Sequence, residues 1–257
     1  MLRLAVLVLV LLGAAQVVSP LPAQAAASGL NLSWSADGAC VSPPIANRDF
    51  ACDTNGATFI AVASFTPDHA VPQFYRMEAV IGCQSDGPLP DWWQASYPGS
   101  CRETSVSTRT SSVAAGGCWS LWPESPALVG LFWWTALYPP PTGTPPGPNR
   151  LLIKVGYQMA TARLNLNVLR EYNAFQLVLD SNHSVAEPGG GGAVCAGCEA
   201  GVSLMLDEIK AIGDAALDII DSPKTSNCIT WQSSTAGCWH PVPVRNTTWG
   251  AIKSFYR

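Results

Sequence analysis

Charged residues are scarce in this chain: only 12% of its 257 residues are Asp, Glu, Lys or Arg. The formal net charge is −4, and the 14 Lys and Arg residues form no cluster. Binding to nucleic acid or to an anionic membrane surface needs a concentrated positive field. The composition therefore predicts no nucleic-acid partner.

The usual catalytic and metal-binding motifs are also missing. The three histidines are His69, His183 and His240. They stand far apart, and no two of them have metal-ligand spacing. No G-x-S-x-G elbow, phosphate-binding glycine loop or dinucleotide fingerprint occurs. We therefore expect no catalytic residue, no metal site and no cofactor.

Beyond the N-terminus, no stretch is both long and charge-free enough to cross a membrane. At the N-terminus, Arg3 precedes an apolar run from Leu4 to Ala15, and Ala23-Gln24-Ala25 has the form of a cleavage site. The run is too short for a stable membrane span, so a retained anchor is the weaker reading. Residues 1–25 are predicted to be a signal peptide of a secreted, periplasmic or cell-surface protein.

Nine cysteines follow that segment, and an oxidising compartment makes disulfides the default. Their spacing favours four local pairs: Cys40 with Cys52, Cys101 with Cys118, Cys195 with Cys198, and Cys228 with Cys238. Cys83 remains as a buried, inert thiol. Spacing alone does not determine the connectivity. The alternatives are a four-thiolate zinc site made by the last four cysteines and a redox-active Cys195-x-x-Cys198 motif.

Apolar and polar residues alternate along many short segments, which is the pattern of β-strands. The predicted strands are Leu30–Trp34, Thr58–Phe65, Tyr75–Ile81, a polar edge strand within Arg102–Ser112, a fully buried strand at Leu128–Leu137, Leu151–Thr161, Phe175–Asp180, Val202–Ile212 and Ile229–Trp231. Phe175–Asp180 and Val202–Ile212 are expected to form a central pair. A helix across Val202–Ile220 is the alternative, because apolar residues there also recur three or four apart.

Helical patterns are few and short. Asp214–Asp221 is expected to be a short helix, and Leu164–Leu169 a helical turn. At the C-terminus, Trp249, Ile252 and Phe255 fall three residues apart and would form one apolar stripe. We expect residues 246–257 to be a short helix docked on the main domain, the alternative being a sorting signal.

Many turn-separated strands without βαβ alternation indicate an all-β fold. We expect one antiparallel two-sheet sandwich over residues 26–245, stapled by disulfides, although the proline-rich Tyr138–Asn149 could also link two smaller domains. The closing run VSLMLDEIKAI, Val202–Ile212, resembles the last strand of jelly-roll carbohydrate-binding modules. That resemblance implies a jelly-roll-like topology.

The chain also resembles a group of uncharacterised secreted bacterial proteins. The shared features are FAC-x-x-N-G at Phe50–Gly56, L-P-x-W-W at Leu89–Trp93, C-A-G-C at Cys195–Cys198 and the TWGxIKSxYR-like ending within Asn246–Arg257. This likeness implies secretion and a common fold. It implies no activity.

Ten tryptophans are the strongest indication of function. Sugar rings stack on exposed indoles, which are flat, rigid and carry a donor at one edge. Trp133 and Trp134 are expected in the core. The candidate ligand-binding residues are Trp92, Trp93, Trp119 and Trp122.

Two functions of different classes follow from these observations. The first is a non-catalytic sandwich that binds an extracellular glycan or envelope polymer. The second is a structural or surface-assembly protein with protein partners, its tryptophans being core residues. Two or more exposed indoles among the four candidates would favour glycan. A glycoside hydrolase-like enzyme, with carboxylates drawn from Asp180, Asp207 and Glu208, is the third hypothesis.

Overall fold

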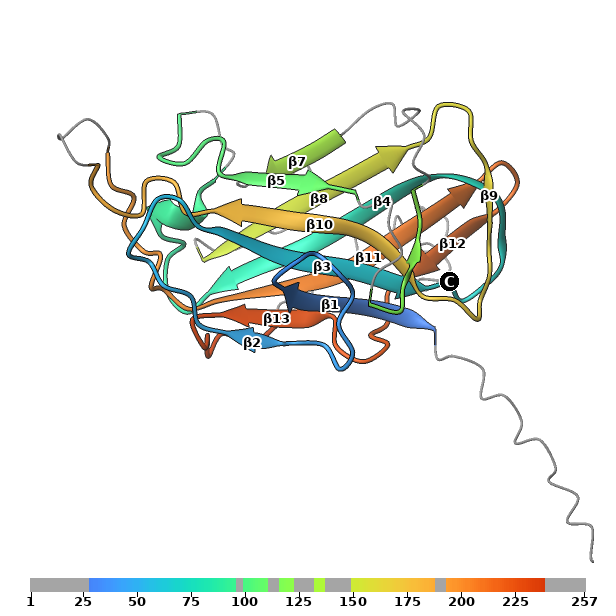
Figure 1. Cartoon of the computed structure of the whole chain (residues 1–257), viewed down its shortest axis with the longest axis horizontal. Coiled ribbons are helices and arrows are strands. Elements are labelled where there is room, and N and C mark those ends of the chain that lie inside the picture. The colour runs from blue at the N-terminus through green and yellow to red at the C-terminus, as the bar shows by residue number, and fades with distance from the viewer. Residues whose placement is uncertain are drawn as a thin grey trace, which may run out of the picture.

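Two β-sheets packed together form the molecule (Figure 1). The structure is a computed structural model, and it describes residues 28–95, 99–110, 116–122, 132–136, 149–187 and 193–238. The predicted signal peptide, residues 1–25, the predicted tail helix, residues 246–257, and the side chains of Trp133 and Trp134 lie outside the described part. Within it, the secondary structure is β-strand, apart from one short 3-10 turn. The all-β prediction is confirmed.

The smaller sheet has the strand order β1-β3-β10-β5, with β6 also paired to β10. These strands are β1 (Gly29–Ser35), β3 (Thr58–Thr66), β5 (Val106–Arg109), β6 (Trp119–Ser120) and β10 (Tyr172–Asp180). All pairs are antiparallel except β6 with β10. The predicted polar edge strand is therefore the short β5, which is the last strand in the order.

The larger sheet has the order β2-β13-β11-β4-β8-β7, with β12 paired to β11 and β9 to β4. Its strands are β2 (Asn47–Arg48), β4 (Val71–Ser85), β7 (Phe132–Ala136), β8 (Arg150–Gln158), β9 (Leu164–Leu166), β11 (Val202–Gly213), β12 (Leu217–Ile220) and β13 (Cys228–Trp231). The pairs are antiparallel except β13 with β2. The long strands β4 and β11 pair along most of their length and form the centre of this sheet.

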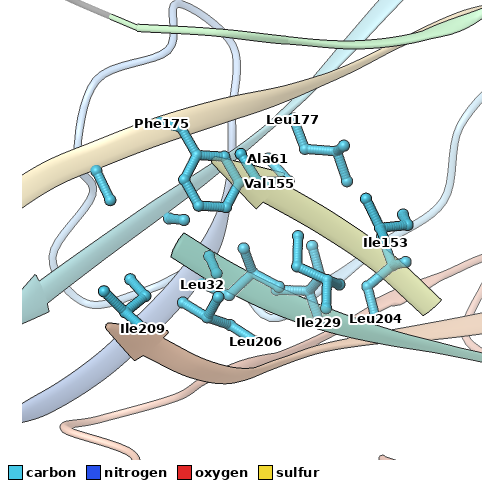
Figure 2. Close-up of a cluster of buried hydrophobic side chains, with 14 of the residues drawn as sticks. Leu32, Ala61, Ile153, Val155, Phe175, Leu177, Leu204, Leu206, Ile209 and Ile229 are labelled. Carbon is cyan, nitrogen blue, oxygen red and sulfur yellow. The ribbon is translucent and has the colours of Figure 1, made fainter. Parts of the chain in front are cut away.

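The core lies between the sheets, because the longer strands β1, β3, β4, β8, β10 and β11 turn apolar faces inward (Figure 2). In β8 the buried positions alternate with exposed ones, as the sequence pattern predicts. Phe175 and Leu177 of the smaller sheet and Ile153 and Leu204 of the larger sheet meet there. Cys83 of β4 is also in this core as a free thiol, and burial raises its pKa. The prediction that Cys83 is buried and outside the disulfides is confirmed.

The predicted central pair is wrong. The segments Phe175–Asp180 and Val202–Ile212 are both strands, but β10 belongs to the smaller sheet and β11 to the larger one. Each is central within its own sheet, so both have the apolar character of interior strands. The chain therefore crosses from one layer to the other between them.

Strand β11 excludes the alternative of a helix across Val202–Ile220. A β-bulge explains why apolar residues in this strand are spaced as they would be in a helix. The pairing of β11 with β4 shifts register between Leu206 and Glu208. A bulge inserts one extra residue, so the next inward position after Leu206 is Ile209, three residues later. That three-residue step imitates a helix within a strand.

Two short helical predictions are also wrong. Asp214–Asp221 contains strand β12, and Leu164–Leu169 contains strand β9. Both strands continue the larger sheet from the ends of long neighbours, β11 and β4. Pairing with an existing edge, which local sequence does not reveal, outweighs weak helix preference in such short segments.

The chain has four disulfides, of which three connect distant parts of the sequence. The four are Cys40–Cys118, Cys52–Cys198, Cys101–Cys195 and Cys228–Cys238. The pair Cys228–Cys238 is as predicted, whereas the local pairs Cys40–Cys52, Cys101–Cys118 and Cys195–Cys198 are wrong. The two cysteines of the C-A-G-C motif bind two different loops, which excludes both the zinc and the redox alternatives for this motif. Four disulfides indicate an oxidising compartment.

Candidate functional site

Three of the four candidate tryptophans are core residues. Trp92 and Trp93 form the 3-10 turn η1 (Asp91–Trp93) and are buried, as is Trp122. The indole nitrogen of Trp122 donates to the carbonyl of Ala174 at 2.6 Å. Because these rings have no free face, the prediction that they bind ligand is corrected. Trp119 alone of the four is exposed, at 49%.

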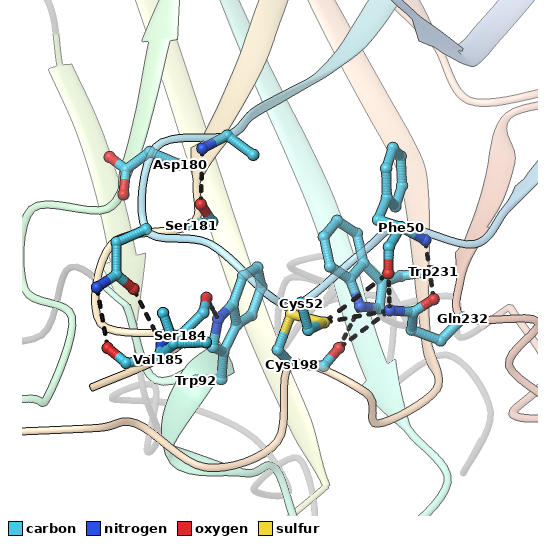
Figure 3. Close-up of a disulfide and its surroundings, with 12 residues drawn as sticks. Phe50, Cys52, Trp92, Asp180, Ser181, Ser184, Val185, Cys198, Trp231 and Gln232 are labelled. Carbon is cyan, nitrogen blue, oxygen red and sulfur yellow. Dashed lines mark hydrogen bonds between the residues drawn. A yellow bond between two sulfur atoms is a disulfide. The ribbon is translucent and has the colours of Figure 1, made fainter. Parts of the chain in front are cut away.

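Trp92 and Trp93 belong to an aromatic cluster centred on Trp231, whereas Trp122 packs against Phe74 and Tyr157. The Trp231 ring lies 4.4 Å from that of Phe50 and 5.0 Å from that of Trp92. Its indole nitrogen donates to the carbonyl of Cys198 at 2.6 Å, beside the Cys52–Cys198 disulfide (Figure 3). Phe50 is held in turn by Gln232, which bonds both its amide and its carbonyl. The F-A-C, L-P-x-W-W and C-A-G-C segments therefore meet in one structural cluster.

Arg102, which the sequence pattern places in a polar strand, is fully buried beside that cluster. Its guanidinium lies 3.5 Å from the centre of the Trp92 ring and donates to the carbonyls of Trp92, Asp180 and Asn182. Burial lowers the pKa of Arg102 to about 10, and the nearby Asp180 partly opposes that shift. The group stays protonated at neutral pH and provides hydrogen-bond donors to three backbone carbonyls.

The carboxylates of the enzyme hypothesis do not converge. Asp180 ends β10 in the smaller sheet, whereas Asp207 and Glu208 lie in β11 of the larger sheet. Glu208 instead pairs with Lys210 at 3.1 Å. In the described part of the chain, no group of three or more His, Cys, Asp or Glu side chains is arranged to hold a metal ion.

A hollow of about 350 Å³ lies on the outer face of the larger sheet, across β4, β8 and β11. Its polar lining side chains are Arg76 and Glu78 of β4, Lys154 and Gln158 of β8, and Glu208 and Lys210 of β11. They occupy the positions that alternate with the buried core residues of the same strands. Five charged side chains are therefore gathered on one face of one sheet.

The register brings these side chains together. Lys210 lies opposite Glu78, and Glu78 lies opposite Gly156. Within single strands, Arg76 pairs with Glu78 and Lys210 with Glu208. We take this hollow as the candidate binding site. The outward alternation of Lys154, Gly156 and Gln158 is visible in the sequence, but the neighbouring strands that complete the hollow are not.

A second polar group lies on the outer face of the smaller sheet, around Glu171. Its carboxylate accepts hydrogen bonds from Ser64 at 2.6 Å, Asn31 at 2.8 Å and the Lys224 ammonium at 2.6 Å. Burial raises the pKa of Glu171, but the hydrogen bonds from Lys224, Ser64 and Asn31 together outweigh it and hold the pKa below its usual value. This group ties β1, β3 and the residue-224 loop to β10.

The lowered pKa of Glu171 makes part of the stability dependent on pH. A carboxylate whose pKa falls on folding stabilises the native state above its unfolded pKa, and that contribution is lost as the pH falls through the folded value. We expect Glu171→Gln to lower the free energy of unfolding by about 1–3 kcal/mol at neutral pH, because the charged hydrogen bonds are lost. Below about pH 4.5 the melting temperature of this variant should fall less steeply with pH than that of the wild type. The exposed Glu199→Gln is the control. Identical pH profiles for wild type and Glu171→Gln would contradict this account.

The exposed Trp119 forms a small surface patch with Leu169 and Arg170. The Arg170 guanidinium lies 3.8 Å from the centre of the Trp119 ring, and Leu169 is 61% exposed. The patch is rigid, because Trp119 follows the disulfide cysteine Cys118 and its amide donates to the carbonyl of Glu171 at 2.8 Å.

Comparison with protein-family models, with curated proteins and with solved structures found no match. In the described ranges, no helix has the length and apolar character that crossing a membrane requires.

Proposed function

We propose that this protein is a secreted, non-catalytic sandwich of jelly-roll-like type that binds an extracellular glycan or envelope polymer on the outer face of its larger sheet. The observation that carries the proposal is the hollow over β4, β8 and β11, with charges of both signs around it. Convergent polar groups around a concavity are the usual form of a binding site. Secretion is supported by the four disulfides.

Hydrogen bonding, rather than ring stacking, is the recognition mode in this proposal. No tryptophan belongs to the described lining of the hollow, and three of the four candidate indoles are buried. Carboxylate, amide and ammonium groups bind hydroxyl-rich polymers through their donors and acceptors. A ligand bound in this way is selected by its polar groups and their spacing.

The test is a glycan-array and envelope-polymer pull-down screen with the mature protein. Glu78→Ala combined with Lys210→Ala removes one charge of each sign from the hollow and leaves the net charge unchanged. We expect this variant to bind at least tenfold more weakly, the loss typical of a charged hydrogen bond or two. Arg163→Ala with Asp214→Ala removes another ion pair, at 3.1 Å, that does not line the hollow. An equal loss in both variants, or no binding by wild type, would refute the proposal.

The second candidate function is surface assembly through a protein partner, and the Trp119 patch is the observation that favours it. Tryptophan and arginine dominate the energetics of protein interfaces. Stacking on a glycan would be favoured by two or more exposed indoles among the four candidate tryptophans. Only Trp119 of these four is exposed, which supports a protein partner over ring stacking on a glycan. If this second function is correct, the pull-down should retain a partner protein. Trp119→Ala should abolish that binding, and the Glu78→Ala, Lys210→Ala double variant should bind the partner as wild type does.

A further inference from the structure

The shape of the hollow depends on Gly156. This residue lies on the outer face of β8 between Lys154 and Gln158, and all three belong to the lining. Lys154 and Gln158 are four steps apart along the extended strand, which is about 13 Å. Because Gly156 has no side chain, the outer surface of β8 is open between the long side chains of Lys154 and Gln158. This opening is part of the hollow of about 350 Å³.

The charges around this opening do not cancel. Arg76 and Glu78 form one ion pair, and Lys210 and Glu208 form another at 3.1 Å. Lys154 is exposed and has no ion-pair partner among the described residues. The described lining of the hollow therefore carries one uncompensated positive charge, on a protein whose net charge is −4.

The remaining groups of the hollow restrict the chemistry of an anion placed there. A phosphate or sulfate is typically held by several cationic or backbone donors, whereas the described lining offers one unpaired ammonium. A single carboxylate matches that charge. Beside it, the Gln158 amide and the Glu78 carboxylate provide a donor and an acceptor for hydroxyl groups. Among the apolar side chains of the described lining, Val80 is partly exposed and the others are buried. An apolar side chain of a peptide would therefore find little apolar surface to pack against.

We infer that the ligand is an acidic polysaccharide and that a uronic acid residue occupies the opening over Gly156, with its carboxylate beside the ammonium of Lys154. This inference rests on the proposed function, since it specifies the ligand of the same hollow. The hydroxyl groups of the sugar bond to Gln158 and Glu78. The ion pair with Arg76 holds Glu78 in place, and the second ion pair joins Lys210 to Glu208, so Arg76 and Lys210 are already paired.

The probes are polygalacturonic acid and its fully methyl-esterified form, which have the same backbone and differ in the carboxylate. Titration calorimetry with the mature protein should show binding to the acid at least tenfold tighter than to the ester. Lys154→Gln should weaken binding to the acid about tenfold, one charged contact, and leave binding to the ester unchanged. Arg109→Gln removes one exposed positive charge from β5 of the smaller sheet and should alter neither affinity.

Each other outcome has a defined meaning. Equal affinity for acid and ester, or equal effects of Lys154→Gln and Arg109→Gln, would overturn the inference while leaving a glycan-binding function in place. Poly-glutamate binding as tightly as polygalacturonate would overturn the assignment to a sugar. Binding to another polymer of the screen but to neither pectin form would also overturn it. Failure to bind any glycan or envelope polymer would remove the proposed function as well.

Discussion

Replacing Cys52 and Cys198 together by alanine is expected to lower the free energy of unfolding by about 4 kcal/mol. The bond joins residues 146 positions apart, and a cross-link that closes a long loop removes more freedom from the unfolded chain, about 5 kcal/mol for a loop of this length. The other long-range disulfides shorten the loop that remains, which reduces the effect. For a domain of this size we expect a melting temperature lower by roughly 10 °C, measured by calorimetry.

The matched control is the double replacement of Cys228 and Cys238. Their bond spans 10 positions, so its removal should cost less, about 3 kcal/mol. Peptide mapping of the unreduced protein provides an independent check, because a fragment containing a Cys195–Cys198 bond would contradict the connectivity. Equal melting of the two double variants would show that loop length does not determine their contributions.

Trp231→Ala is expected to destabilise the protein by about 3–5 kcal/mol, the range for removing a large buried aromatic side chain. Trp231 is fully buried, and its ring contacts those of Trp34, Phe50, Phe59, Trp92 and Trp93. The replacement leaves a cavity among rigid rings that cannot close around it. It also removes the donor of the hydrogen bond to the Cys198 carbonyl.

Trp119→Ala is the matched control, since it removes the same side chain from a half-exposed position. We expect it to cost no more than about 1 kcal/mol. Both variants can be measured by urea unfolding of the mature protein at neutral pH. A similar loss in the two variants would show that Trp231 is not the centre of the aromatic cluster.

Local alternation was sufficient to predict most strands but not their neighbours. The pattern of β8 identifies both its buried face and the outward Lys154, Gly156 and Gln158. Which sheet a strand joins depends on contacts with residues far along the chain, and that is why β10 and β11 were predicted to pair when they lie in opposite sheets. The candidate hollow depends on the same long-range information, because its lining comes from three strands.

The wrong disulfide pairs have a related cause. Short spacing favours pairing in an unfolded chain, where loop closure costs entropy according to length. In the folded protein the sandwich has already brought Cys101 to Cys195 and Cys52 to Cys198. Tryptophan burial likewise follows from tertiary contacts: the Trp92-Trp93 pair in η1 is covered by segments more than 80 residues away, such as Ser184, which accepts a hydrogen bond from Trp92 at 2.7 Å.

The thiol of Cys83, which is outside the disulfides, can report how often the two sheets separate. Cys83 lies between the layers with no exposed surface, while the other eight cysteines are bonded. A thiol-specific alkylating reagent can reach it only in molecules whose layers have separated, and a buried thiol is a poor nucleophile until then. The rate of modification at this one atom therefore measures how often the native sandwich opens, without any added label or engineered site.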